Sequence, residues 1–189
     1  MKITFDLLEN ADAKVREAIL YVSKKCEKDE TFGATMLNKV LFFADIDLFL
    51  RTGKSVTERQ HQKLPQGPAL RCLMPIRDRM EAAGTLKREK HRFMGKTQDR
   101  PIALREPDTS VFTAEELAAL DAAIAALRDK TATQVSAMSH KRFNWWDLLK
   151  LKETVDLRMA LLRKPNRVPQ EVIVSALKGT RHRGQVLIE

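Results

Sequence analysis

Two segments near the N-terminus place apolar residues at helical spacing. In residues 11–26 they recur every three or four positions, which predicts an amphipathic helix. Residues 36–51 are apolar on almost every side, as in a helix that is central and buried. Thr35 suits the position that caps this second helix, and Gly53 suits its C-terminal stop.

The chain after Gly53 changes character. Residues 54–67 are polar and rich in turn formers, so the pattern predicts a loop. Pro68 follows Gly67 and suits the first turn of a helix, which we expect over residues 68–83.

The rest of the pattern predicts one hairpin and several helices. Residues 85–94 and 100–105 alternate as two strands around a turn at 95–99. Thr113 and Glu116 form a capping-box pattern for a helix over 114–128. Shorter helical patterns cover 132–139, much of 144–162, and 169–178. The sequence therefore predicts an α+β fold, mainly α: a compact helical domain over residues 1–162 with a small antiparallel β-hairpin near 85–105, followed by a basic C-terminal helix or tail over 163–189.

Positive charge is concentrated in two places. The chain has a formal net charge of +9. Residues 85–105 hold seven basic against two acidic residues, and residues 163–183 hold six against one, so each segment nets +5. Such patches fit an acidic protein surface or nucleic acid, although a solvated surface explains charge runs equally well. The candidate partner contacts are Lys87, Arg88, Lys90, Arg92, Lys96, Arg163, Lys164 and Arg167.

Several features favour a cytoplasmic protein without a membrane partner. No apolar run approaches the roughly 18 residues that a membrane span needs. The first residues lack the pattern of a secretory signal. Cys26 and Cys72 occupy apolar positions, as expected of buried free thiols in a reducing compartment, with a disulfide as the alternative.

No constellation of residues indicates catalysis, a metal or a cofactor. The four histidines are scattered, and glycine motifs for phosphate are missing from the sequence. Ser136 and His140 share a helical face, which is a weak signal, and a histidine placed favourably at a helix C-terminus is the better explanation. Asp45 and Asp47 point to different sides of their helix, so we expect Asp45 to accept hydrogen bonds inside the fold.

The order of two helices and a basic hairpin resembles a winged helix, in which the hairpin contacts the DNA backbone. The helix that would read the major groove offers Arg71, Arg77, Asp78 and Arg79 as outward polar side chains. A nucleic-acid-binding protein that regulates its own gene is therefore the alternative function.

Three motifs together resemble a known family. LNKVLFFAD at 37–45, TGKSVT at 52–57 and KLPQGPA at 63–69 are similar to the Panacea antitoxin domain, the SocA-like family, and Ser139-His140 with Trp145 resembles its Ser-His…Trp element. The matching positions are Lys39, Asp45, Gly53, Gly67, Pro68, Ser139, His140 and Trp145.

The resemblance implies a non-enzymatic antitoxin that neutralises a cognate protein toxin by direct binding. One branch of the family resembles an adaptor that hands its partner to a ClpXP-type protease. The motif residues suit burial and turn geometry, so we expect structural roles for them. Lys39 should either snorkel or pair with Asp45 or another carboxylate, and Trp145 should fill the core. We expect the partner to contact the hairpin and the tail instead.

Overall fold

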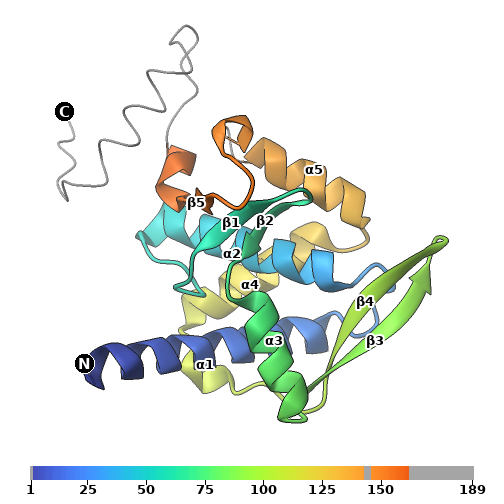
Figure 1. The fold of residues 1–189 in the computed structure, drawn as a ribbon, viewed down its shortest axis with the longest axis horizontal. Helices are drawn as coiled ribbons and strands as arrows, with labels where there is room; N and C mark the ends of the chain where they lie inside the picture. Colours follow the sequence, from blue (N-terminus) through green and yellow to red (C-terminus); the bar gives the residue numbers. More distant parts are fainter. Residues whose placement is uncertain (1, 143–145, 162–189) are drawn as a thin grey trace, which may run out of the picture.

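The computed structural model describes residues 2–142 and 146–161, which form a mainly helical α+β domain (Figure 1). Side chains are described for residues 12–141 and 146–161. The helices are α1 (Lys2–Lys25), α2 (Ala34–Thr52), α3 (Leu73–Ala82), α4 (Ala114–Leu127) and α5 (Ala132–Arg142), with 3-10 turns at Thr109–Val111, Trp146–Leu148 and Leu157–Leu161. The strands are β1 (His61–Leu64), β2 (Gly67–Leu70), β3 (Leu86–Phe93), β4 (Lys96–Ala103) and β5 (Thr154–Val155).

Helix α2 is the centre of the domain, as its apolar pattern predicts. Its buried side chains face in several directions, and it contacts α1, α4, α5 and β2. Gly53 ends it in the left-handed region (φ 75°), where its N–H donates to Phe49 O over 2.8 Å. The expected cap at Thr35 is wrong, because the helix already begins at Ala34 and Gly33 precedes it without a side-chain cap.

A three-stranded sheet is present where a loop over 54–67 and the start of a helix at 68 were predicted. β1 pairs with β2 through the turn at Pro65 and Gln66, and β5 pairs with the other side of β1. Pro68 lies in β2, at the edge of this sheet, where a residue without an N–H is tolerated. The prediction of a helix over 68–83 is therefore wrong at its start, since α3 begins at Leu73.

The predicted hairpin is present, with a tighter turn than expected. Only Met94 and Gly95 connect the strands, with φ values of 48° and 75°. Two positive φ values are typical of a type I′ turn, which suits the twist of a hairpin. β4 therefore begins at Lys96 and not near residue 100. β4 contacts α1 and α2 while β3 contacts α3, and Figure 1 shows the hairpin projecting beyond the helices.

The C-terminal half of the described chain is helical at first and then irregular. α4 begins with the predicted capping box: Glu116 N–H donates to Thr113 Oγ1, and Thr113 N–H donates to Glu116 Oε2. The prediction of a mostly helical 144–162 is wrong for the described part, which forms two 3-10 turns and β5. Lys152, at φ 65°, turns the chain so that its N–H reaches Lys63 O, 2.7 Å away.

Trp145, the helix expected at 169–178 and the basic tail over 163–189 lie outside the described residues.

Candidate functional site

A groove of about 720 Å³ lies beside the tip of the hairpin. We call it the hairpin groove. Its walls come from the β3–β4 tip, the start of α2, the β1–β2 turn and the start of α5, including Phe93, Met94, Lys96, Gly33, Gln66 and Ser136. Its volume is in the range of binding sites for small molecules and side chains.

Two contacts hold the hairpin against this groove. Gln98 Nε2 donates to the carbonyl of Glu30 over 2.8 Å. At Gly33, a Cβ atom would lie 3.0 Å from Gln98 Oε1 and 3.2 Å from Asp99 O, so glycine permits the close approach of β4 to the start of α2. The backbone of β4 therefore packs directly against Gly33, and together they form one wall of the groove.

Ion pairs within the protein neutralise the base of the basic hairpin. Lys87 pairs with Glu89 at 2.6 Å and Lys90 with Asp99 at 2.8 Å, while Arg88 pairs with Asp78 at 2.9 Å and also with Glu81. These contacts lower the pKa of Glu81, through its bond with Arg88, and of Asp99, through its bond with Lys90. Three of the five hairpin cations predicted to contact a partner thus already have a partner inside the molecule.

The tip of the hairpin is different. Arg92 and Lys96 are exposed, and neither has an ion pair with any described side chain. Between them lies Met94, which is 77% exposed and is the most exposed large apolar residue of the described chain. The tip combines unpaired positive charge with an uncovered apolar side chain. Met94 was not among the predicted contact residues, although an apolar residue next to Gly95 in a polar hairpin is a usable signal.

The arginines expected to read DNA are either buried or bonded within the protein. Arg77 is 1% exposed, which corrects the prediction that it points outward. Burial lowers its pKa, with Arg88 contributing, and its Nε and Nη2 atoms have no hydrogen-bond partner among the described residues. Arg71 donates to Lys152 O and Thr154 Oγ1, each over 3.1 Å, and Arg79 donates to Asp12 over 2.8 Å.

Three family-motif positions meet in the interior, at Lys39, Gly67 and Ser139. Lys39 is 2% exposed, and its Nζ donates to the carbonyl of Pro68 over 3.0 Å. The expected pairing of Lys39 with Asp45 is wrong. A Cβ atom on Gly67 would lie 2.3 Å from Lys39 Nζ and 2.5 Å from Ser139 Oγ, and Gly67 has φ 106°. Burial without a carboxylate lowers the pKa of Lys39 to about 7.

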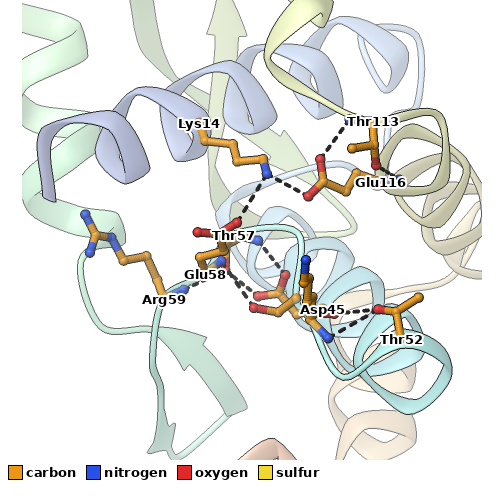
Figure 2. A network of polar contacts seen from close by, with 10 residues as sticks. Lys14, Asp45, Thr52, Thr57, Glu58, Arg59, Thr113 and Glu116 are labelled. Carbon is orange, nitrogen blue, oxygen red and sulfur yellow. Dashed lines mark hydrogen bonds and ion pairs between the residues drawn. The ribbon is translucent and has the colours of Figure 1, made fainter. Parts of the chain in front are cut away.

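Asp45 is the acceptor of a second buried network, as predicted. Its Oδ1 accepts from Thr57 N over 2.8 Å, and its Oδ2 accepts from Thr57 Oγ1 and contacts His61 Nε2 at 2.8 Å. Figure 2 shows Asp45 pointing from α2 toward Thr57, and Lys14 of α1 between Glu58 and Glu116. These contacts bind the loop after Gly53 to α1 and α2, and Lys14 also links α1 to α4. Sequence reasoning missed His61, which it placed in a loop.

His140 packs against an aromatic ring. It stacks on Trp146 with ring centroids 4.7 Å apart. Burial lowers the pKa of His140, and the positive charges of Lys39 and Lys63 add to the effect. His140 lies in the last turn of α5, as expected, but its burial and the nearby lysines disfavour its charged form. Ser139 Oγ donates to Ser136 O over 2.7 Å.

The described residues offer no metal-binding arrangement: nowhere among them do three His, Cys, Asp or Glu side chains gather as ligands could. Cys26 and Cys72 are free thiols, and burial raises the pKa of Cys26 to about 11. In the part of the chain that the structure describes, no helix has the length and apolar character to cross a membrane.

Comparison with known proteins gives one match. A family model described as "Antitoxin SocA-like, Panacea domain" matches residues 37–146, which include α2, both sheets' hairpins, α4 and α5. Neither the curated proteins nor the solved structures contain a significant match. The matched range contains the buried motif residues and most of the hairpin groove, whose remaining wall comes from residues 31–36.

Proposed function

The chain belongs to the SocA-like antitoxins with a Panacea domain, and we propose from this membership that it binds and neutralises a cognate protein toxin. A family of antitoxins implies a toxin as partner in general. We further propose that the toxin is held at the tip of the hairpin and in the hairpin groove.

The observation that carries this proposal is the composition of the tip. Arg92 and Lys96 keep their charge free of ion pairs with described side chains, and Met94 is uncovered beside them. A central apolar side chain rimmed by charge is the usual composition of an energetic centre in a protein interface. The groove next to it can receive a side chain of the partner.

The buried motif residues have another role in this proposal. They stabilise the part of the fold against which the hairpin packs. These residues are Lys39, Asp45, Gly53, Gly67, Pro68, Ser139 and His140, and the sequence assigns Trp145 the same role. The basic residues Arg163, Lys164 and Arg167, which belong to the basic segment 163–189 of the sequence, supply a second contact surface. The protein is non-enzymatic and acts in the cytoplasm.

Co-expression tests the antitoxin function. The protein encoded by the neighbouring gene should arrest growth when expressed alone, and growth should recover when this chain is expressed with it. A harmless neighbour, or a neighbour that stays toxic in complex with this chain, contradicts the proposal.

The same experiment separates two modes of neutralisation. If the chain blocks the toxin by occupancy, toxin levels stay constant during rescue. If it acts as an adaptor for a ClpXP-type protease, toxin levels fall, and rescue fails in cells that lack the protease.

Nucleic-acid binding remains the second candidate, because the free cations Arg92 and Lys96 also suit phosphate contacts. The burial of Arg77 and the intramolecular contacts of Arg71 and Arg79 oppose base reading by α3. Binding of duplex DNA that weakens steeply with salt and is lost in Arg92→Glu would favour this function.

A further inference from the structure

We propose that an acidic, extended segment of the toxin adds to the outer edge of β3 as a further strand, pairing with the main chain at Lys90 and Arg92. This inference rests on the proposed function and specifies how the partner is held. Strand addition supplies affinity through main-chain hydrogen bonds and leaves specificity to side chains.

The register of the hairpin shows which main-chain groups point outward. In an antiparallel pair, every second residue exchanges hydrogen bonds with the partner strand, and the residues between direct their N–H and C=O away from it. Leu104 N–H donates to Thr85 O over 3.0 Å, so residues 85 and 104 are a bonded pair. Counting along the register, Glu89 and His91 bond to β4, whereas Arg88, Lys90 and Arg92 face outward.

Two further contacts agree with this assignment. Arg88 N–H lies 3.3 Å from Glu81 Oε1, on α3 and outside the hairpin. Asp99 O, on an outward-facing residue of β4, lies against Gly33.

The two edges of the hairpin therefore differ. β4 lies against α1 and the start of α2, and Pro101 removes an outward N–H from its outer edge. A proline at an edge is one way in which proteins block strand addition. On β3, Glu81 occupies the N–H of Arg88, but the N–H and C=O groups of Lys90 and Arg92 have no hydrogen-bond partner among the described residues. The open edge is thus confined to the end of β3 next to the tip.

The net charge of β3 decides which kind of strand can pair with its outer edge. β3 has four basic residues and one acidic residue, for a net charge of +3. A second copy of this chain would place two such strands side by side, and like charges facing each other destabilise a strand pair. An acidic segment gains from the same charges, above all from Arg92, which has no ion pair inside the described structure. We therefore assign the edge to an acidic segment of another protein.

Two substitutions at one position separate the main chain from the side chain. Lys90→Gln removes the charge and keeps the outward N–H, whereas Lys90→Pro removes both. Proline is acceptable here because the N–H of Lys90 makes no bond within the hairpin, as at Pro101 on β4. Arg92→Gln and Arg92→Pro repeat the comparison. Circular dichroism, Tm and slow exchange of the Glu89 and His91 amides check that the hairpin is intact.

The probe is the purified protein encoded by the neighbouring gene, and the measurement is its Kd. We expect Lys90→Gln to weaken binding a few-fold and Lys90→Pro to weaken it about tenfold further, the effect of losing a hydrogen bond from an interface. Equal Kd values for the Pro and Gln variants at both positions, with the hairpin intact, overturn strand addition and leave the antitoxin function standing. Failure of the wild-type protein to bind or neutralise its neighbour overturns both.

Discussion

The buried motif residues and the hairpin tip are two polar regions of one domain. The first lies in the interior and the second is exposed to solvent. Lys39, Asp45, Gly67 and Ser139 lie in the interior. Residues of α2, the loop after it, β1, β2 and α5 surround them. Arg92, Met94 and Lys96 lie in solvent on a projecting hairpin. The first region carries the family pattern, and the second carries the groups that are free to bind.

The difference has a physical reason. A buried polar group is costly unless it is hydrogen-bonded, so each interior motif residue fixes its neighbours and tolerates little change. An exposed residue on a hairpin tip can change with small effect on the fold.

Gly67→Ala should have the largest effect on stability. The new methyl group would collide with Lys39 Nζ and Ser139 Oγ, and φ 106° disfavours any residue other than glycine. Strain and overpacking together should lower the free energy of unfolding by about 3–5 kcal/mol, measured by urea titration. Gly53→Ala is the matched control, with a positive φ but nothing within 4 Å of the new methyl group. Equal losses in the two variants would contradict the tight packing at Gly67.

Asp45→Asn should come next. The amide places a donor where Asp45 accepts from Thr57 and contacts His61. We expect the free energy of unfolding to fall by about 2–4 kcal/mol, because a buried network loses its charged acceptor. Glu115→Gln, an exposed carboxyl change on α4, should alter it by less than about 0.5 kcal/mol. An unchanged free energy of unfolding in Asp45→Asn would show that this network does not stabilise the fold.

Lys39→Met should reveal the buried amine through pH. The unfolded chain keeps the lysine proton up to about pH 10.4, whereas the folded protein releases it near 7. Between these values unfolding takes up a proton, so the free energy of unfolding of the wild type rises with pH relative to that of Lys39→Met. We expect about 1 kcal/mol per pH unit between pH 7 and 9. The exposed Lys54→Met should run parallel to the wild type; a parallel Lys39→Met would show that Lys39 is charged at pH 7 in the folded state.

The long elements of the fold could be predicted, because their signals are local. The apolar surface of 36–51, the stop at Gly53 and the Thr113–Glu116 capping box each depend on neighbouring residues, and all three are confirmed. The small sheet could not be predicted in the same way. β1, β2 and β5 have four, four and two residues, too few for alternation to appear, and Gly67-Pro68 suits a strand edge as well as a helix start.

The candidate site was predictable in outline only. The charge run located the hairpin, but ion pairing of Lys87, Arg88 and Lys90 depends on which carboxylates the fold brings near. The same holds for Lys39, whose partner is a backbone carbonyl 29 residues away in sequence and not the nearby Asp45. Ion pairs between residues that are far apart in sequence cannot be read from the sequence. Because they occupy Lys87, Arg88 and Lys90, the candidate contact surface is the tip of the hairpin and not the whole hairpin.

We propose that the partner is bound at the hairpin tip and not by the buried motif. The double variant Arg92→Glu/Lys96→Glu tests it most directly, through the Kd for the protein encoded by the neighbouring gene. Lys54→Glu/Arg51→Glu, two exposed cations at the end of α2, is the matched control for charge. We predict that the tip variant keeps the wild-type Tm and binds at least about tenfold more weakly, while the control binds like the wild type. Wild-type affinity in the tip variant would contradict the account.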